Sequence, residues 1–178
     1  MLFRSTEDIA NLLSEQKIVA VYNGLAEAGQ RALGNRSILF DARNKEAKNI
    51  VNSVKNREWY RPFAGAVLKE DFTECFDTYG LTESPFMTLS FPVTTCDIPG
   101  VTHVDNTCRV QTVDNSIPHL YNLLTEFKQI TGCSVLLNTS FNLAGEPLVE
   151  TINEAIETFN NSKIDVLWFP ELNKMIRK

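Results

Sequence analysis

Short apolar runs that alternate with amphipathic stretches are the feature that most constrains the fold of this chain. Strands are predicted at residues 18–22, 37–40, 64–68, 87–91, 108–113, 134–137 and 166–169. Helices are predicted at residues 5–16, 45–54, 72–76, 116–130 and 151–160. Several connections between strands are too short to hold a crossover helix, so the sheet is not expected to be all parallel. The pattern therefore predicts an α/β fold with helices flanking a mixed sheet.

Local signals mark the ends of some of these elements. Ser5 can cap the first helix, and the spacing of Thr151 and Glu154 is that of a capping box. Residues 77–86 are polar and contain turn-forming residues. We therefore expect a surface loop there and regard it as a candidate lid.

Length and composition bound the class of protein. With 178 residues, 43% of them hydrophobic, the chain is expected to form a single domain over residues 1–178. No apolar run approaches the roughly 20 residues that cross a bilayer. The first residues also lack the basic and then apolar layout of a secretory signal. We therefore expect a cytoplasmic protein without a membrane anchor.

The cysteine pattern gives no metal signature. The four cysteines have no metal-ligand spacing and are accompanied by only two histidines, so no structural zinc site is predicted. In a reducing compartment all four are expected to be free thiols: Cys75, Cys96, Cys108 and Cys133.

A concentration of positive charge in an otherwise acidic chain indicates an anion site. Residues 31–61 contain eight Lys or Arg and three Asp or Glu, whereas the whole chain has a formal net charge of −5. Local potential rather than net charge retains a polyanion, and arginine suits a phosphate or carboxylate that is met in a fixed geometry. The alternative is a solvated basic helix face, and charge alone favours that alternative.

Four sequence blocks, in order along the chain, favour the anion site over the solvated helix face. The first reads Arg31-Ala-Leu-Gly-Asn35-Arg36-Ser, and the second reads Lys55-x-Arg57-Glu-x-x-Arg61-Pro-Phe-Ala. The third reads His103-Val-Asp105-Asn-Thr-Cys-Arg109-Val-Gln, and the fourth reads Asn138-Thr-Ser140-Phe-Asn142-x-x-Gly-Glu-Pro. From about Thr6 to Phe169 the chain resembles the carbamoyltransferase family of the NodU and CmcH type. Four ordered blocks are far more specific than one glycine-rich match.

The resemblance implies a fold, an activity and a partner. In that family this region is a YrdC-like domain with a twisted mixed sheet, and it joins carbamate from carbamoyl phosphate to the AMP moiety of ATP. A larger, iron-binding domain of the actin-like ATPase type then transfers the carbamoyl group from carbamoyladenylate to a hydroxyl acceptor. The blocks around Lys55 and Ser140 are also distantly similar to those of the YrdC threonylcarbamoyladenylate synthases. The implied ligands are ATP, carbamoyl phosphate and Mg²⁺, and the implied partner is a separate acceptor-binding domain.

The chemistry and the resemblance together give the candidate site. Forming an acyl-adenylate depends on positioning and charge neutralisation more than on a protein nucleophile. Three residues are expected to be catalytic: Lys55, Arg61 and Arg109. Seven more are expected to bind the nucleotide or carbamoyl phosphate: Arg31, Asn35, Arg36, Arg57, Asn138, Ser140 and Asn142. For Arg36 and Arg57 an equal alternative is a buried arginine that holds Asp41 or Glu58.

Other residues in or near the blocks are weaker candidates for the site. His103 is expected to be packed and hydrogen-bonded rather than to act as a general base. Glu27 and Asp105 are candidates to hold Mg²⁺. The second block also contains three aromatic residues: Trp59, Tyr60 and Phe63. At least two of them are expected in the core, which leaves one to stack on adenine.

Departures from the family pattern leave a second class of function open. Four positions differ from the family's usual residues: Leu25, Ala26, Gln30 and Asn106. The larger acceptor domain has no counterpart in these 178 residues. Either a separate chain supplies it, or this chain performs only the adenylation, or the chain has lost activity and simply binds a nucleotide. The chief alternative is a non-catalytic YrdC-like module that binds a nucleotide or RNA. The net charge of −5 argues against broad affinity for nucleic acid.

Overall fold

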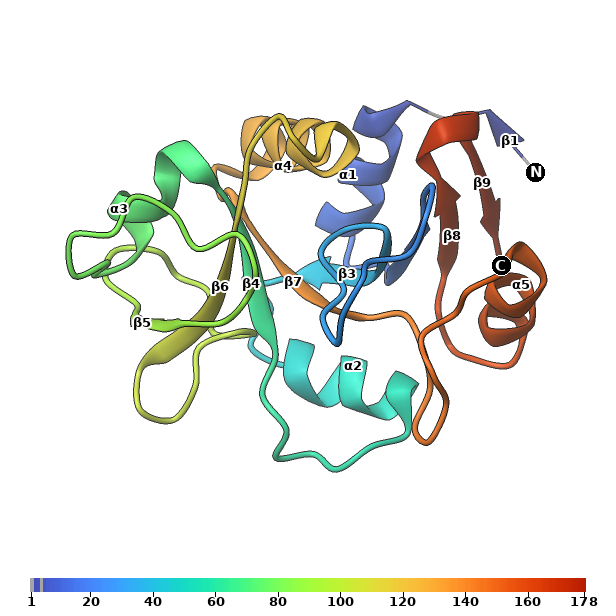
Figure 1. The fold of residues 1–178 in the computed structure, drawn as a ribbon, viewed down its shortest axis with the longest axis horizontal. Helices are drawn as coiled ribbons and strands as arrows, with labels where there is room; N and C mark the ends of the chain where they lie inside the picture. Colours follow the sequence, from blue (N-terminus) through green and yellow to red (C-terminus); the bar gives the residue numbers. More distant parts are fainter. Residues whose placement is uncertain (1, 4) are drawn as a thin grey trace.

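The computed structural model describes residues 2, 3 and 5–178, and nine strands within these residues form one sheet (Figure 1). In sequence order they are β1 (Leu2–Phe3), β2 (Val19–Tyr22), β3 (Arg36–Asp41), β4 (Ala64–Leu68), β5 (Ser90–Pro92), β6 (Thr107–Val113), β7 (Val135–Ser140), β8 (Val166–Phe169) and β9 (Lys174–Arg177). Across the sheet the order is β1-β9-β8-β2-β3-β7-β4-β6-β5. The pairs β2 with β8 and β4 with β6 are parallel, and the other neighbours are antiparallel. The predicted mixed α/β sheet is confirmed.

Helices cover both faces of the sheet and bury a hydrophobic layer on each (Figure 1). They are α1 (Thr6–Ser14), α2 (Ala47–Lys55), α3 (Phe72–Cys75), α4 (Pro118–Thr131) and α5 (Ile152–Asn160), with short 3₁₀ turns η1 (Lys69–Asp71) and η2 (Pro170–Leu172). On one face α1 and α4 pack over Leu39 and Leu136, and on the other α2 and α5 pack over Phe40 and Leu137. Consecutive strand residues point to opposite faces, so β3 and β7 supply both layers.

Two helix starts follow the predicted capping signals. Ser5 Oγ accepts from Asp8 N at 3.2 Å, and the Asp8 carboxylate accepts from Ser5 N at 2.9 Å. Thr151 Oγ1 accepts from Glu154 N at 3.2 Å, and the Glu154 carboxylate accepts from Thr151 N at 3.0 Å. Each capping box satisfies backbone N–H groups that a helix end leaves open.

Several strand boundaries differ from the sequence prediction. The strand predicted at residues 87–91 is replaced by β5, because Met87 has a left-handed φ of 53° that no strand accommodates. The strand predicted at residues 134–137 is longer in the structure, where β7 continues to Ser140, since Asn138 and Ser140 both pair with β3. The strand β9 was not predicted, because its short Lys-Met-Ile-Arg sequence is half polar and becomes a strand only by pairing with β8 and β1.

The polar segment at residues 77–86 is held against β6. Ser84 N donates to Thr112 Oγ1 at 2.9 Å, and Thr112 N donates to Ser84 O at 2.9 Å. Ser84 Oγ also donates to Val110 O at 3.1 Å. These bonds fix the segment to the sheet, which does not favour the lid expected from the sequence.

The expectation of four free thiols is wrong. Cys75, in α3, forms a disulfide with Cys96, 21 residues further along, because the fold brings their Cα atoms to 5.0 Å. Cys108 and Cys133 are free. Burial raises the pKa of Cys108 to about 12, which makes its thiol unreactive.

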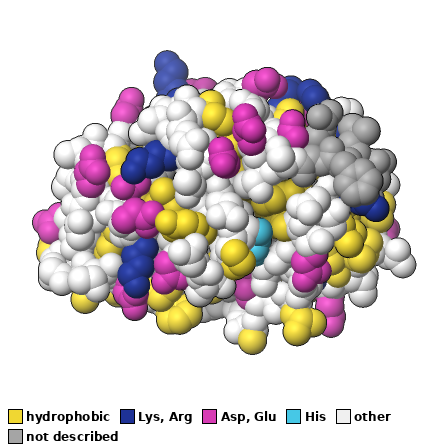
Figure 2. Space-filling view, turned by 90° about the horizontal axis from the view of Figure 1, so that it is seen from above, with side chains coloured by type: hydrophobic (Ala, Val, Ile, Leu, Met, Phe, Trp, Pro, Cys, Tyr) yellow, Lys and Arg dark blue, Asp and Glu magenta, His cyan; other side chains and the backbone are white. Residues whose placement is uncertain are grey.

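The surface reflects the acidic balance of the sequence. On the face that α1 and α4 cover, acidic side chains are scattered among apolar and uncharged ones (Figure 2). Among the described residues, no helix has both the length and the apolar character needed to cross a membrane.

Candidate active site

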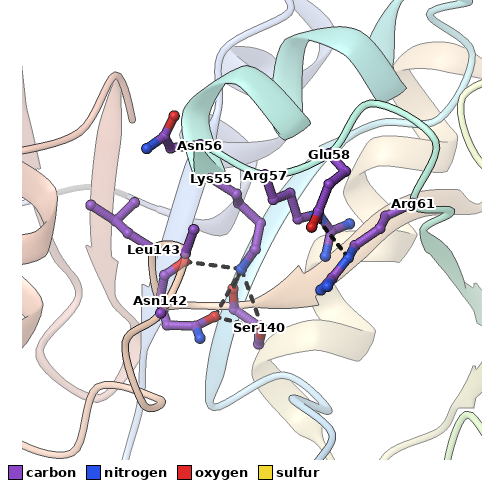
Figure 3. Close-up of a pocket in the computed structure, with 10 residues that line it drawn as sticks. Lys55, Asn56, Arg57, Glu58, Arg61, Ser140, Asn142 and Leu143 are labelled. Carbon is purple, nitrogen blue, oxygen red and sulfur yellow. Dashed lines mark hydrogen bonds and ion pairs between the residues drawn. The ribbon is translucent and has the colours of Figure 1, made fainter.

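A cleft lies between the C-terminus of α2 and the loop that follows β7 (Figure 3). It has a volume of about 560 Å³ and is lined by Lys55, Asn56, Arg57, Glu58, Arg61, Ser140, Asn142, Leu143, Ala144 and Gly145. Half of this lining was predicted from the sequence: Lys55, Arg57, Arg61, Ser140 and Asn142. The fold therefore brings the second and fourth sequence blocks together, although Lys55 and Ser140 are 85 residues apart.

The ends of two elements build this cleft. Helix α2 ends at Lys55 because Asn56 takes a left-handed conformation with φ of 50°. Ala144 N then donates to Lys55 O at 2.9 Å, which ties the loop after β7 to the helix end. Gly145 has φ of 80°, a conformation that glycine adopts without strain, and this lets the loop turn back.

The side chain of Lys55 is buried and directed at the end of β7 (Figure 3). Nζ donates to Ser140 O at 2.6 Å and to Asn142 O at 2.9 Å. It also lies 2.8 Å from Asn142 Oδ1 and 3.3 Å from Ser140 Oγ. Burial, and to a smaller extent the charge of Arg57, lowers the pKa of Lys55 to about 7. An anion in the cleft would raise this pKa again, because it stabilises the charged form.

Four arginines interact electrostatically with one another: Arg31, Arg57, Arg61 and Arg109. Of these, Arg57 also acts on Lys55. Burial lowers the pKa of Arg57 to about 10, and the charges of Arg61 and Arg109 add to the shift. Burial and then the charge of Arg31 lower the pKa of Arg109. Such mutual repulsion costs free energy that a bound anion relieves. The cation cluster, defined as these four arginines, is therefore a candidate anion site.

Two members of the cation cluster have buried N–H groups without a partner. Arg57 Nε donates to Asn52 Oδ1 at 2.6 Å, and its Cζ lies 4.3 Å from the centre of the Phe63 ring. Arg57 Nη2 and Arg109 Nε are buried as well, but neither has a hydrogen-bond partner among the described residues. Because buried donors are nearly always paired, both atoms are suited to an acceptor on a ligand.

Arg61 is the more exposed member of the cation cluster. Its Nε pairs with the Glu58 carboxylate at 2.9 Å, and 54% of the Arg61 side chain is exposed. Exposed pairs of this kind contribute at most about 1 kcal/mol. A phosphate can therefore displace Glu58 at little cost.

The amide side chains of Asn138, on β7, and Gln111, on β6, bind the backbone of the first block. Arg109 and Asn138 lie in one row across β6, β4 and β7. Asn138 Nδ2 donates to Gln111 Oε1 at 2.8 Å and to Ala32 O at 3.3 Å, and Gln111 Nε2 donates to Leu33 O at 2.7 Å. These bonds hold the segment after Arg31 over the polar ends of β6 and β7.

Arg36, also in the first block, has a different environment. Its guanidinium stacks 3.6 Å from the centre of the Tyr22 ring. Its five N–H groups all donate to backbone carbonyls, at 2.8 to 3.3 Å: those of Asn23, Gly24, Asn35, Val149 and Glu150. No N–H group is left for a phosphate, so we assign Arg36 to the support of the surrounding loops and not to the cleft.

Asn35 also supports the loop at residues 23–35. Its backbone N donates to Glu27 Oε1 at 2.7 Å, and its Nδ2 donates to Leu25 O at 3.0 Å. Asn35 Oδ1 in turn accepts from Asn23 Nδ2 at 3.1 Å. The side chain is therefore used within the loop.

The carboxylates expected as structural partners of Arg36 and Arg57 bind other arginines. Asp41 pairs with Arg43 at 2.7 Å, and Glu58 pairs with Arg61. Asp41 therefore does not hold Arg36. Glu58 acts on Arg57 through its charge, which raises the pKa of Arg57 against the larger effect of burial.

The expectation that two of the three aromatic residues enter the core is also wrong. Trp59 is 71% exposed and Tyr60 is 61% exposed, whereas Phe63 is buried. Asn52 Nδ2 donates to the carbonyls of Trp59 and Arg61 at 3.2 and 3.3 Å, which fixes the backbone on either side of Tyr60. The two exposed rings contact each other edge to face, with centroids 6.1 Å apart, and Lys48 Nζ lies 5.7 Å from the centre of the Trp59 ring.

His103 is held by its neighbours. Its Nε2 lies 3.1 Å from Phe63 O, and its Nδ1 lies 3.3 Å from Thr107 Oγ1. With both ring nitrogens engaged, this geometry fits the packed and hydrogen-bonded alternative.

The two candidate magnesium ligands are engaged locally. Glu27 Oε1 accepts from the backbone N of Leu33 at 2.7 Å, and Asp105 Oδ1 accepts from Thr107 Oγ1 at 2.7 Å. In the part of the chain that the structure describes, no group of three or more His, Cys, Asp or Glu residues is placed to hold a metal ion.

Two residues that shape the site were not predicted. Gln111 stands two residues after Arg109, so the period of a strand places both on one face of β6. That signal is readable in the sequence. Asn52, which orients Arg57, is a buried polar residue of α2 beside Val51 and could be noticed as a polar interruption of the apolar helix face.

Comparisons with known proteins agree with this arrangement. Residues 10–177 match the family described as Carbamoyltransferase C-terminus. The nodulation protein NolNO of Sinorhizobium fredii is 42% identical over 164 residues, which cover 89% of this chain and 24% of that protein. The 3'-hydroxymethylcephem-O-carbamoyltransferase of Streptomyces clavuligerus is 37% identical over 150 residues, which cover 83% of this chain and 28% of that protein. The chain thus spans about a quarter of the length of these curated relatives.

Solved structures show the same fold. Full-length HypF in its phosphate- and nucleotide-bound form has a TM-score of 0.68 at 20% identity, over 92% of this chain and 24% of that chain. Sua5 of P. abyssi complexed with L-threonine has a TM-score of 0.66 at 16% identity, over 92% of this chain and 46% of that chain. At such identities the likeness shows the fold alone, and it confirms the expected YrdC/Sua5-like architecture.

Proposed function

Because the chain belongs to the family of carbamoyltransferase C-terminal domains, we propose that it makes carbamoyladenylate from ATP and carbamoyl phosphate. The observation that carries the proposal is the cation cluster. Buried N–H groups of Arg57 and Arg109 lack partners in the described chain, and the charges around them repel one another. Phosphate and carbamate oxygens would satisfy those donors and relieve the repulsion.

The proposed reaction needs charge neutralisation more than a protein nucleophile. Water hydrolyses carbamoyl phosphate to carbamate and inorganic phosphate. A carbamate oxygen then attacks the α-phosphorus of ATP while the bond to pyrophosphate breaks. Arg61 and Arg109 neutralise the charge on the reacting groups, and Arg31 and Arg57 bind phosphate oxygens. Preorganised cations of this kind account for most of the catalysis in phosphoryl transfer.

Lys55 combines two roles in this proposal. Its bonds to the Ser140 and Asn142 carbonyls shape the loop after β7, and its charge adds to the potential of the cleft. Ser140 and Asn142 line the cleft. Ser140 Oγ donates to Asn142 Oδ1 at 2.7 Å, and in this proposal it turns from that bond to a phosphate oxygen when the ligand binds. Mg²⁺ would enter with ATP, because it binds mainly through phosphate oxygens and water.

A partner for transfer follows from the coverage of the relatives. Their chains are far longer than the region matched here, and one of them is named as a carbamoyltransferase. We infer that a partner domain binds the hydroxyl acceptor and takes the carbamoyl group. HypF, which was solved with nucleotide and phosphate bound, contains a region of the same fold and so gives general support for these ligands.

The second candidate function is a non-catalytic module that binds a nucleotide or RNA. The exposed rings of Trp59 and Tyr60 beside the cleft favour it, because such rings stack on bases. A salt titration separates the two functions. A long RNA that contacts many phosphates gives a steep dependence of affinity on salt, whereas a single nucleotide gives a shallow one.

Release of pyrophosphate tests the proposed function. Purified protein with ATP and Mg²⁺ should release pyrophosphate only when carbamoyl phosphate is added. Equal release without carbamoyl phosphate would refute the proposal. In the absence of a partner, we expect a burst of about one equivalent and then slow turnover, because a reactive adenylate must be kept from water until an acceptor arrives.

A further inference from the structure

The disulfide anchors one end of the connection between β5 and β6. This connection, residues 94–105, is called the brace loop below, and it is closed at its base by Val93 and Asn106. Val93 N donates to Asn106 O at 2.9 Å, and Asn106 Nδ2 donates to Val93 O at 3.1 Å. Two surface cavities, of about 420 Å³ and about 180 Å³, border the loop.

The first part of the brace loop is exposed and is held to α3. Thr94 N donates to Cys75 O at 3.0 Å, and the hydroxyls of Thr94 and Thr95 donate to Glu74 O at 3.0 and 2.7 Å. Water competes for hydrogen bonds at such exposed positions. The bond between Cys75 and Cys96 is therefore the anchor of this part that water cannot replace.

The rest of the brace loop connects this anchor to the cation cluster. Its middle is packed tightly, because Gly100 N donates to Ala42 O at 2.9 Å and a Cβ on Gly100 would lie at that distance from the same oxygen. At its far end His103 Nε2 lies 3.1 Å from Phe63 O, and the Phe63 ring lies 4.3 Å from Arg57 Cζ. Packed segments transmit a displacement instead of absorbing it. Release of the first part should therefore reach Arg57.

The two bonded sulfurs differ in access. Cys75 is 2% exposed and belongs to the core, whereas Cys96 is half-buried and lines the larger cavity. A disulfide opens when a thiolate attacks one of its sulfurs and displaces the other. Cys96 Sγ is thus the atom that a thiolate can reach, and Cys75 is the leaving group.

We propose that Cys96 is a site of thiol–disulfide exchange, at which a dithiol opens the bond to Cys75, frees the brace loop and weakens nucleotide binding. One thiolate of the dithiol bonds to Cys96 Sγ, and Cys75 leaves as a thiolate that takes up a proton. The second thiolate of the dithiol then bonds to the first sulfur of the dithiol and displaces Cys96, which is protonated in turn. Two electrons pass to the protein, and the dithiol becomes a cyclic disulfide. The effect on the nucleotide rests on the function proposed above.

Trapping with glutathione, a monothiol, identifies the sulfur that is attacked. The full chain is incubated with excess glutathione, quenched in acid and analysed by peptide mass spectrometry. The glutathione adduct should be on Cys96. An adduct on Cys75, or none on either residue, would overturn the inference.

Hydrogen exchange of the oxidised and the dithiothreitol-reduced protein tests release of the brace loop without any ligand. Exchange should become faster within residues 94–105 and stay unchanged in the central strands β3 and β7. Unchanged exchange in the loop would contradict the proposal. Faster exchange across the whole sheet would contradict it as well, because the disulfide would then hold the domain and not the loop.

Calorimetric titration of ATP into the two forms tests the link to the nucleotide. Reduction should weaken binding about threefold to tenfold, the range for coupling through packed side chains. The double variant Cys75→Ser/Cys96→Ser should bind as the reduced protein does and should not respond to dithiothreitol. The matched control is Cys133→Ser, which removes a free, half-buried thiol and should respond as the wild type does. Equal affinities of the oxidised and reduced forms would overturn the inference.

Failure of this inference can be distinguished from failure of the proposed function. Equal affinities together with pyrophosphate release that requires carbamoyl phosphate would refute only the effect of the disulfide. ATP that binds neither form would refute the proposed nucleotide site and the effect on it, and glutathione trapping and hydrogen exchange would still decide whether Cys96 opens the brace loop.

Discussion

Arg36 and Arg109 stand on strands of the same sheet, but their guanidinium groups have opposite surroundings. Arg36 directs all five N–H groups at backbone carbonyls and stacks on Tyr22. Arg109 faces the charge of Arg31, and its buried Nε has no partner in the described chain. An arginine with saturated donors stabilises the fold, whereas one that lacks acceptors is prepared for an anion. The comparison separates supporting residues from ligand-binding residues within one set of sequence blocks.

The largest expected effect is on stability. Arg36→Met should lower the free energy of unfolding by about 3 kcal/mol or more, because buried carbonyls from several segments lose their donor. Chemical denaturation followed by circular dichroism measures the loss. Arg109→Met is the matched control and should lose no stability. Similar losses in the two variants would show that the two environments do not differ in the way described.

Arg61→Lys should weaken binding of ATP by roughly 1.5 to 3 kcal/mol, the range for a hydrogen bond to a charged group. The reason is that lysine cannot reproduce the forked contact of a guanidinium with a phosphate. Calorimetry on both proteins measures the difference. Arg177→Lys, on β9 at another part of the sheet, serves as control and should bind as the wild type does. Unchanged binding in Arg61→Lys would make Arg61 peripheral.

The pH dependence of binding tests Lys55. Because the pKa of Lys55 is lowered to about 7, the empty protein loses this charge above neutral pH. Affinity for ATP, whose phosphates are already ionised, should therefore fall by about tenfold between pH 7 and pH 9. In Lys55→Met this dependence should disappear. A dependence that persists in the variant would assign it to another group.

The same pKa shift fixes the sign of a stability effect. Between about pH 7 and the ordinary lysine value of 10.5, the unfolded chain holds a proton that folded Lys55 has released. Since the unfolded state then binds more protons, this group makes the free energy of unfolding rise with pH over that window. Denaturation midpoints of wild type and Lys55→Met across the window measure its contribution.

The smallest expected effect is a gain in stability. Arg109→Met removes a partly buried charge that Arg31 repels, so the protein without ligand should become more stable by about 0.5 kcal/mol. Thermal denaturation at low salt, where repulsion is least screened, is the measurement. A loss of several kcal/mol would place Arg109 with Arg36 among the supporting residues.

Periodicity predicted the fold wherever local sequence and tertiary context agree. The bounds of β4 and β8 are those expected from their apolar runs, and the capping signals of α1 and α5 formed as expected. The strand β9 could not be predicted, because its pairing with β8 and β1 makes it a strand. Local patterns therefore fix elements that are apolar in themselves, and not those that depend on neighbours.

The candidate site was predictable in part for a similar reason. Ordered blocks placed Lys55, Ser140 and Asn142 in one cleft. They did not separate Arg36 from the other arginines, because one of its acceptors, Val149 O, comes from a residue 113 positions away. A carbonyl acceptor has no signature in sequence. Composition likewise gave no sign that Trp59 and Tyr60 would be exposed, since an amide of α2 sets the path of their loop.

The most direct test of the central claim is the affinity for ATP when the unpartnered donors are removed together. ATP is titrated by calorimetry into the wild type and into the double variant Arg57→Gln/Arg109→Met, with folding checked by circular dichroism. If the cation cluster is the nucleotide site, the double variant should bind ATP at least tenfold more weakly, because it loses two charged donors. Equal affinity in the two proteins would contradict the claim and place the nucleotide elsewhere.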